Sequence, residues 1–362
     1  MTTTAPDRDI AVVGSGSLAR SICYSLAVAA DPPPRTVTVL ARNETAAQEI
    51  ACIADARAAA SSAATRFRAT AVDARDRDAM AGLLRRIAPR VVVNCASVQS
   101  PWEAAHAPSG WTRLLSEAGF GLALPLHAVL AREVACAVRS AGVPAVFVNA
   151  CYPDAVNPVL HAEGIPVACG VGNVATLAAA LRAVLRPRAG VRLRVLAHHS
   201  HLHAPADPHH EVRAWLDDQP VQDVGRLLAA HRACGREELN AVTGHTAALF
   251  LARLAAGAET YADLPGPLGL PGGYPVRVRD RQITLDLPHG ITRKEAIAWQ
   301  QRMAGLDGVV VTSSGRIHLG PRAASALAGH LPGDCAGRPT DSVRELTGQL
   351  LDLRDTLRAT PA

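Results

Sequence analysis

The sequence has almost no lysine. Of its 37 Lys and Arg residues only Lys294 is a lysine. A lysine general base or Schiff base would therefore have to be this one residue, in the first turn of a late predicted helix. The arginines are scattered rather than gathered in one stripe, so the net charge of +5 gives no reason to expect a nucleic-acid partner. A mildly basic surface suits an anionic cofactor or substrate instead.

Three further absences narrow the class of protein. None of the four tyrosines lies four residues before Lys294, which excludes the Tyr-x-x-x-Lys pair of short-chain reductases. The eight cysteines include no CxxC pair and lie mostly in apolar runs, as buried small side chains do. The start, MTTTAPDRD, does not resemble a signal peptide, and no uncharged apolar run is long enough to span a bilayer. We therefore expect a soluble, cytoplasmic protein with no membrane partner.

The chain is long enough for two domains. It has 362 residues, of which 49% are hydrophobic and 19% charged, so it can bury sizeable cores. Strands and helices alternate through the first half, which predicts an α/β fold with a Rossmann doubly wound parallel sheet. We expect a dinucleotide-binding domain over 1–170 and an α+β substrate-binding and oligomerisation domain over 171–362. The predicted strands are 9–13, 36–40, 66–72, 91–95, 143–149 and 165–169, and the helices 17–30, 44–60, 76–87, 124–141 and 173–185.

The alternation breaks after a predicted strand at 191–197. Residues 198–210 read HHSHLHAPADPHH, a loop by their prolines and polarity. A capping box at Thr292 and Glu295 predicts a helix start. The further expected elements are helices at 222–233 and 237–256, a Pro- and Gly-rich linker at 264–273, two short strands in 275–287, a helix at 292–305, a hairpin of 309–312 with 316–319, and a helix at 342–357.

Residues 10–19 read IAVVGSGSLA, a G-x-G-x-x-A motif between a strand and a helix. Gly14 permits a tight turn, and Gly16 has no side chain to block a pyrophosphate. Ala19 allows close packing of helix on strand, and the helix N-terminus supplies amide donors. This context predicts a bound dinucleotide, with Ser15, Ser17 and Leu18 as further contacts.

The ends of the next strands indicate which dinucleotide binds. An NAD site usually carries an acidic residue after the second strand, whereas this chain has Arg42 and Asn43 there. Because an arginine suits a 2′-phosphate, we favour NADP, with NAD as the second choice in view of Glu44. Asp73 follows the third strand, where it could meet the adenine. The fourth strand ends in VVVNCASV, which places Asn94, Ala96 and Ser97 near the ribose or pyrophosphate.

Histidine is the best candidate for a proton donor, since its pKa lies near neutral pH. Six of the fourteen histidines fall in 198–210, after a strand and on the side where substrates bind. A histidine-rich surface loop and a metal site are alternative interpretations, although the spacing matches no zinc signature. In an extended segment His199, His201 and His203 would share one face and His198 the other.

The order of elements resembles the lactate/malate dehydrogenase superfamily, which is similar in fold to family 4 glycosidases. In that group an Asn-Pro-x-Asp segment follows the fifth strand, and here Asn149 to Asp154 occupies the place. A later strand of the group ends in Gly-Glu-His-Gly, whose histidine exchanges a proton with the substrate. The resemblance, which covers 9–205, implies that His199 is this histidine and that Asn149 lies near the nicotinamide.

The sequence departs from that group at one helix. Its dehydrogenases carry Leu-Asp-x-x-Arg after the sixth strand, where the Asp orients the histidine and the Arg clamps a carboxylate. This chain has GNVATL at 172–177, so Asn173 could replace the Asp, but the Arg is absent. A 2-hydroxy acid is therefore not the expected substrate. The N-terminal domain is also similar to those of opine and saccharopine-type dehydrogenases, which reduce imines.

We thus expect an NAD(P)H-dependent oxidoreductase that reduces a C=O or C=N bond of a small or biosynthetic-intermediate substrate. The predicted catalytic residues are His199, His201 and Asn173, and the predicted substrate-binding residues are Tyr152, His198 and His203. The expected assembly is a homodimer or homotetramer, without a metal ion. Two alternatives stay open. One is a nicotinamide-using lyase or glycosidase-like enzyme with a metal on Cys151 and a histidine, and the other is a non-catalytic NADP sensor.

Overall fold

The computed structural model describes residues 9–361 with gaps at 30, 35 and 332–336. The expectation that the first residues form no signal peptide, and the predicted helix end at residue 30, lie outside the described residues. One helical stretch in the described part, Phe120–Ala141, has the length and apolar composition of a membrane span, and 89% of that window is buried inside the molecule.

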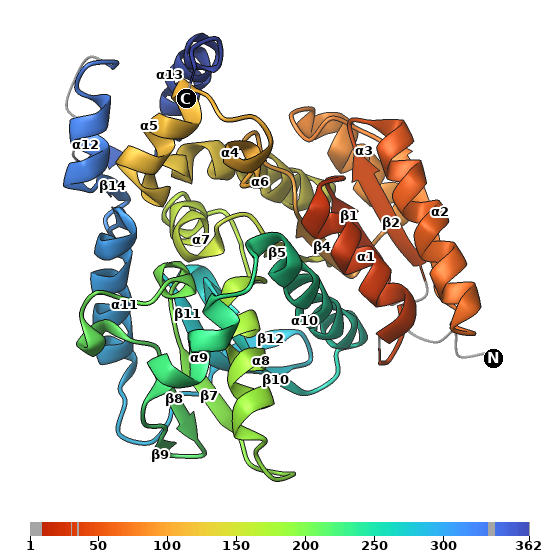
Figure 1. The fold of residues 1–362 in the computed structure, drawn as a ribbon. Helices are drawn as coiled ribbons and strands as arrows, with labels where there is room; N and C mark the ends of the chain where they lie inside the picture. Colours follow the sequence, from red (N-terminus) through yellow and green to blue (C-terminus); the bar gives the residue numbers. More distant parts are fainter. Residues whose placement is uncertain (1–8, 30, 35, 332–336, 362) are drawn as a thin grey trace.

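A six-stranded parallel sheet forms the first half of the chain (Figure 1), in the order β3-β2-β1-β4-β5-β6. This is the strand order of a dinucleotide-binding Rossmann fold, so the predicted fold class is confirmed. The central strands are continuous apolar runs because helices cover both faces of the sheet. The strands are β1 Ile10–Val13, β2 Thr36–Ala41, β3 Arg66–Ala71, β4 Val91–Asn94, β5 Val146–Asn149 and β6 Cys169–Gly170.

The helices predicted for this half are present near their expected bounds, and the structure adds four helical segments between residues 103 and 162 that the sequence did not predict. Helices α2 (Glu44–Ala60) and α6 (Leu124–Ala141) have the predicted bounds, and Asn43 and Asp76 cap the helices that follow them. The predicted strand at 165–169 is wrong for most of its length, since only Cys169 pairs there. The other helices are α1 Ser17–Ala29, α3 Arg77–Ile87, α4 Glu103–His106, α5 Gly110–Ala118, the 3-10 helix η1 Phe120–Ala123, and α7 Pro153–Ala162.

The second half carries three small antiparallel sheets. The 264–273 segment is a correction, because it is no linker: β10 (Thr260–Pro265) pairs with β11 (Gly273–Arg279) across it, and the 3-10 helix η4 (Pro267–Gly269) makes the turn. The 198–210 loop contains two 3-10 helices, η2 (His199–Leu202) and η3 (Pro208–His210). The remaining strands are β7 Leu193–Leu196, β8 Arg213–Leu216, β9 Gln219–Pro220, β12 Gln282–Leu285, β13 Val309–Val311, β14 Arg316–Leu319 and β15 Arg338–Pro339.

The helices of this half are close to their predicted positions. Helix α8 (Asn173–Leu185) matches its prediction, and the predicted Thr292–Glu295 capping box starts α11. Helix α10 lies beside α1 in Figure 1 and shares a core with it. The further helices are α9 Val224–Arg232, α10 Arg236–Ala256, α11 Arg293–Asp307, α12 Pro321–Leu327, the 3-10 helix η5 Thr340–Ser342, and α13 Val343–Arg358.

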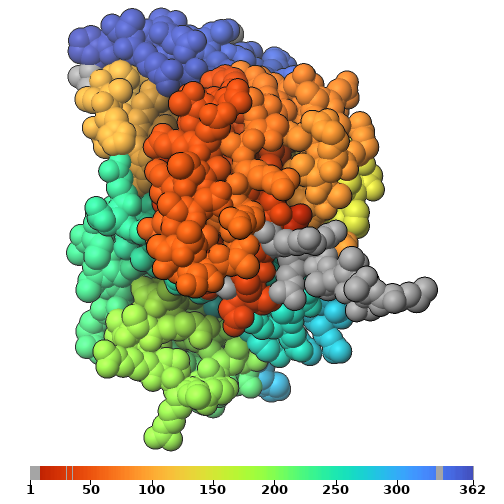
Figure 2. Space-filling view, turned by 90° about the vertical axis from the view of Figure 1, so that its right-hand side faces the viewer, coloured from red at the N-terminus to blue at the C-terminus, as the bar shows by residue number. Residues whose placement is uncertain are grey.

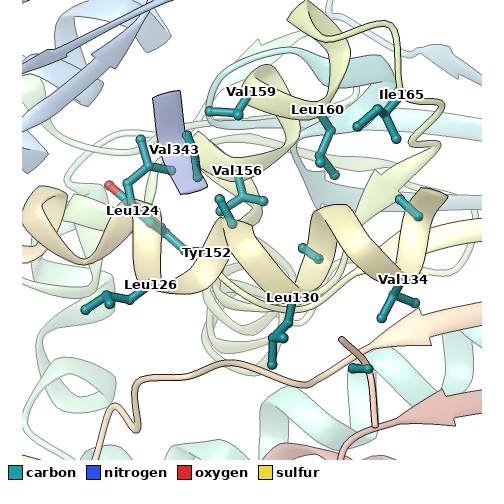
Figure 3. Close-up of a cluster of buried hydrophobic side chains, with 14 of the residues drawn as sticks. Leu124, Leu126, Leu130, Val134, Tyr152, Val156, Val159, Leu160, Ile165 and Val343 are labelled. Atoms are coloured by element: carbon teal, nitrogen blue, oxygen red, sulfur yellow. The ribbon is translucent and has the colours of Figure 1, made fainter. Parts of the chain in front are cut away.

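The C-terminal helix returns to the first half of the chain. Figure 2 shows the C-terminal residues, in blue, lying against the N-terminal half, in red to orange. Leu346 and Leu350 of α13 are buried in the core that α6 shares, and the Thr347 hydroxyl donates to the Pro125 carbonyl at 2.9 Å. In Figure 3, Val343 lies beside Leu124 at the start of α6. One core therefore crosses from the first half into the last residues, and the division at residue 170 stays a prediction.

A close backbone approach fixes the end of α11. A Cβ atom at Gly121 of η1 would overlap the carbonyl carbon of Gly308 and lie 2.8 Å from the amide nitrogen of Val309. Gly121→Ala must therefore push two backbones apart, and we expect a loss of about 1–3 kcal/mol of unfolding free energy. Thermal and urea denaturation would measure it.

The matched control is Gly348→Ala in α13, where a Cβ meets nothing within 4 Å. Since alanine is the better helix former, this variant should keep or raise the melting temperature. Equal stability of the two variants would contradict the proposed backbone constraint at Gly121.

Candidate active site

A cleft of about 990 Å³ opens along the carboxyl ends of β1, β2, β3 and β4. Its lining comes from both halves of the chain: the turn after β1, the ends of the neighbouring strands, and residues of α8, η2, α10 and α13. Ligands of doubly wound sheets bind at this edge, because the strand order reverses there. This cleft is therefore the candidate ligand site.

The glycine-rich turn has two different glycines. The Gly14 amide donates to the Leu40 carbonyl at 2.8 Å, its φ is +118°, and a Cβ there would lie 3.0 Å from the Ala96 nitrogen. Gly14 is thus required by the fold itself. A Cβ at Gly16 would meet nothing within 4 Å, and Gly16 lines the cleft. Residues 14–18 all line the cleft and leave room for a dinucleotide beside the start of α1.

Basic side chains lie at the next strand ends. Arg42 is exposed at the end of β2 and lines the cleft with Asn43, whose side chain caps α2 by accepting from the Ala46 amide. Asp73 and Arg75 line the cleft after β3. Arg75 was missed in the sequence, although its place two residues after a strand-end carboxylate is a usable signal. Glu44, the reason for keeping NAD open, bonds Gln48 and lies off the cleft lining.

Two predicted cofactor contacts lie behind the cleft instead. Asn94 and Asn149 are fully buried, and the Asn94 side-chain amide donates to the Asn149 side-chain oxygen at 3.3 Å. Asn149 in turn donates to Asn157 of α7 at 3.0 Å. This is a correction: both amides satisfy one another and neighbouring groups between strand ends and α7. Ala96 and Ser97 do line the cleft.

Ser97 leads to a histidine that the sequence did not single out. The Ser97 Oγ lies 2.9 Å from Nδ1 of His127, a buried residue of α6 that lines the cleft. Burial, and then the charge of His199, lower the pKa of His127 to about 4, so its ring is neutral at neutral pH. No sequence signal marks it, because it sits within the apolar pattern of a core helix.

His199 lies where the cleft meets the second half. Its Nδ1 is 3.1 Å from both carboxylate oxygens of Asp307, and its backbone amide donates to Asp154 at 3.0 Å. The ring stacks on Phe120, with 4.0 Å between the ring centres. The side chain is 15% exposed. Because Nδ1 is held by Asp307, Nε2 is the nitrogen left to meet a ligand.

Asp307 is held by a second partner. The Tyr152 hydroxyl donates to the Asp307 Oδ2 atom at 2.6 Å. The Tyr152 backbone is left-handed, with φ 46° and ψ 53°, a conformation that costs about 1 kcal/mol or more for a non-glycine residue. Tyr152 also lines the cleft, and its contact with substrate stays a prediction. No local pattern marks Asp307, which lies 108 residues beyond His199.

His199 and Asp307 shift each other's pKa in opposite directions. Burial alone would lower the pKa of His199, but the charge and hydrogen bond of Asp307, together with the charge of Asp154, raise it above its ordinary value. Burial would raise the pKa of Asp307, but His199, then His198 and Tyr152, hold it well below its usual range. The arrangement favours an imidazolium beside a carboxylate. A histidine in this state can hand a proton to a ligand through Nε2.

The other predicted histidines are distributed differently from the expected pattern. His198 is fully buried, and burial lowers its pKa to about 3. His201 is also buried, stacks on Trp299, and donates from Nε2 to the His210 carbonyl at 2.7 Å. Neither lines the cleft, so both are corrections, and only His203 joins His199 there. The period-two expectation is wrong because His199–Leu202 is a 3-10 helix rather than an extended segment.

Asn173 does not take the role of an orienting carboxylate. It starts α8 and lines the cleft, but no hydrogen bond joins it to His199 within the described structure. Asp307 fills that role from α11. Asn173 is therefore corrected from a proton-positioning residue to a residue of the cleft wall.

Cys151 is poorly placed to be a metal ligand. Cys151 is buried, its thiol donates to the Ala96 carbonyl at 3.3 Å, and burial raises its pKa to about 12. Across the described ranges no three His, Cys, Asp or Glu side chains are grouped to hold a metal ion. The hypothesis of a metal on Cys151 and a histidine therefore has no geometric basis in this part of the chain.

No protein-family model matches the sequence, and no curated protein matches it. Solved structures do match its fold. A lactate dehydrogenase, MGS-M5, from a Medee basin deep-sea metagenome library is 14% identical over 84% of this chain and 97% of its own, with a TM-score of 0.56. The minor L-lactate dehydrogenase of Enterococcus mundtii is 17% identical over 83% of this chain and 96% of its own, with a TM-score of 0.53.

The malate dehydrogenase of Picrophilus torridus is 11% identical, and the match covers 89% of this chain and 99% of its own, with a TM-score of 0.56. These identities are low, while the matches extend through both halves of the chain. The predicted resemblance is thereby confirmed at the level of the fold: the chain has a lactate/malate dehydrogenase-like Rossmann fold with a further C-terminal part.

Proposed function

We propose that the protein is a nicotinamide-dependent oxidoreductase that reduces a C=O or C=N bond, with His199 as the proton donor. One observation carries the proposal: His199, held by Asp307, lines the same cleft as the Gly14–Leu18 turn. The turn offers a place for a dinucleotide, and the pair offers a proton beside it. The proteins of similar fold are named lactate and malate dehydrogenases, which agrees with this chemistry.

NADP is the proposed cofactor, with NAD second. Arg42 and Arg75 line the end of the cleft where the adenosine would lie, and Glu44 is turned to Gln48. Arginine is the side chain that best matches a 2′-phosphate. When bound, the nicotinamide supplies the hydride. The residues of this chain then bind, orient and protonate.

His199 supplies the proton that reduction requires. As a carbonyl or imine carbon gains a hydride, its oxygen or nitrogen becomes basic and needs a proton from a nearby acid. Nε2 of His199 can give this proton, while Nδ1 stays on Asp307. Asp307 keeps the ring oriented and stabilises its charged form, and Tyr152 holds the second carboxylate oxygen. The neutral His127 can only accept or donate a hydrogen bond in the same wall.

Dinucleotide binding is tested at Gly16. Because a Cβ there meets only open cleft, Gly16→Val should abolish binding of NADPH and NADH while leaving the melting temperature unchanged. Titration calorimetry and thermal denaturation measure the two effects. The matched variant Gly14→Ala should instead lower the melting temperature, because its Cβ would crowd the Ala96 backbone. Failure of the wild-type chain to bind either dinucleotide would remove the basis of the proposal.

Cofactor choice is tested at Arg42. Arg42→Ala should weaken NADPH about 10- to 100-fold and NADH little, because only NADPH carries a phosphate for a charge-assisted hydrogen bond. Arg66→Ala is the control, since Arg66 is an exposed arginine at the amino end of β3, away from the cleft lining. An equal effect of Arg42→Ala on both dinucleotides would make Arg42 a bystander.

Proton transfer is tested by pH. In the reducing direction His199 must be protonated, so kcat/KM should fall as the pH rises through the pKa of His199, which Asp307 raises. Asp307→Asn removes that charge and should move this limb to lower pH. A screen of aldehydes, ketones and imines with NADPH provides the rates, and an NMR titration of the ring follows the pKa without any substrate.

His199→Asn should lower turnover about 10²- to 10⁴-fold and leave NADPH affinity nearly unchanged. A folded His198→Asn variant should keep its activity, because His198 lies behind the cleft. The reverse result, with loss in His198→Asn and normal turnover in His199→Asn, would reassign the proton donor.

A further inference from the structure

Arg236, the first residue of α10, carries a charge that no carboxylate balances within the described residues. Its guanidinium donates to the Leu202 carbonyl, and it is only partly exposed. Burial, and then repulsion by Arg232, lower its pKa. Arg232 itself is neutralised by two short contacts with Glu211. Arg236 is thus a partly desolvated cation that has no carboxylate partner in this part of the chain.

Arg236 lies at the reacting end of the cleft. It lines the cleft together with His199 and His203; burial and then the charge of Arg236 lower the pKa of His203, and the same charge opposes the rise in the pKa of His199. The Arg236 guanidinium bonds the Leu202 carbonyl of η2, the 3-10 helix that begins at His199, whereas the proposed place of the dinucleotide phosphates is the Gly14–Leu18 turn and Arg42. An anion that meets Arg236 therefore comes from the substrate rather than from the cofactor.

The acids nearest His199 do not compete for this arginine. Asp154 is 1% exposed and accepts from the His199 amide. The Asp307 side chain is 7% exposed and is occupied by His199 and Tyr152. Neither of them lines the cleft. The wall at Arg236 is accordingly left positive.

Helix α10 sets the position of this charge. Arg236, Leu239, Asn240 and Thr243 follow one another at helical spacing, and all line the cleft. The helix is held close to α1, because a Cβ at Gly244 would overlap the side chain of Ser21. The lining face of α10 therefore presents a guanidinium and a carboxamide at fixed places along the substrate end.

Arg236 does not lie where the arginine of the Leu-Asp-x-x-Arg pattern lies. In that pattern the arginine binds a carboxylate directly beside the reacting carbon. In the Leu-Asp-x-x-Arg pattern that position corresponds to Thr176, whose hydroxyl is buried and lies 3.0 Å from the Thr243 hydroxyl. Arg236 precedes Thr243 by two helical turns, a rise of about 10 Å. The anionic group of the substrate must then lie several bonds from the reacting carbon.

We infer that Arg236, with Asn240 beside it, is a subsite for a remote carboxylate or phosphate of the substrate. The inference rests on the proposed function, since it takes His199 as the reacting end. It assigns the substrate class as an oxo or imino compound with its anionic group several bonds from the reduced carbon. A guanidinium recognises either anion by paired hydrogen bonds.

Calorimetry on the NADPH-loaded protein tests this with unreactive probes. Glutarate or glycerol 3-phosphate should bind more tightly than the short dianion oxalate, and uncharged glutaramide should not bind. Arg236→Met should weaken the bound probe about 10- to 100-fold. The control Arg253→Met, at the far end of α10 where the guanidinium meets the Glu259 carbonyl, should bind as wild type.

Two failures are separable in this design. If the wild-type chain binds neither NADPH nor NADH, the proposed function itself is wrong. If NADPH binds normally but Arg236→Met leaves every probe unaffected, or if oxalate binds best, the remote anion subsite is wrong while the proposed function stands. Thermal denaturation of each variant confirms that it is folded.

Discussion

The carboxylate of Asp307 joins the two halves of the chain, because it bonds His199 in the second half and Tyr152 in the first. Asp307 ends α11 and His199 starts η2, so their contact joins two segments that are far apart in the sequence. It depends on Gly121, whose missing side chain lets η1 lie against the Gly308 backbone. It depends also on Tyr152, which accepts a left-handed backbone in order to reach Asp307. Strain and close packing are both concentrated around this one carboxylate, as is common where geometry serves chemistry.

The charges of the cleft are separated by sign. The carboxylates of Asp154 and Asp307 lie behind the His199 ring and are almost fully buried, where they raise the pKa of the ring. Arg42 and Arg236 instead line the cleft, Arg42 after β2 and Arg236 at the start of α10. An acid behind the histidine favours its charged form, while cations in front favour anionic ligands. Proton donation and anion recognition are therefore compatible within one cleft.

Local patterns predicted the first half of the molecule well, and long-range contacts limited the rest. The strand–turn–helix spacing located Gly14 and Gly16, and capping residues located the helix starts. The order of strands and helices, and its resemblance to the lactate/malate dehydrogenase superfamily, selected His199 among the neighbouring histidines. Nothing local marks Asp307 or His127, since both became site residues through tertiary packing. Asn94 and Asn149 stand at the expected strand ends, but buried amides bond one another before they meet solvent. Histidines 198 and 201 were misplaced because one 3-10 turn changes the direction of each side chain.

The start of α8 differs from the Leu-Asp-x-x-Arg pattern at two positions, and the two differences fit together. In the group that the chain resembles, one helix carries the acid that orients the histidine and the arginine that clamps a carboxylate. Here Asn173 and Thr176 stand at those positions, Thr176 bonds Thr243, and the acid comes from α11. With the acid supplied elsewhere, the first turn of α8 need no longer hold charges. A cation on α10 can then set the distance between the reacting carbon and an anionic group. In our proposal, the residue that selects the substrate is therefore separate from the one that delivers the proton.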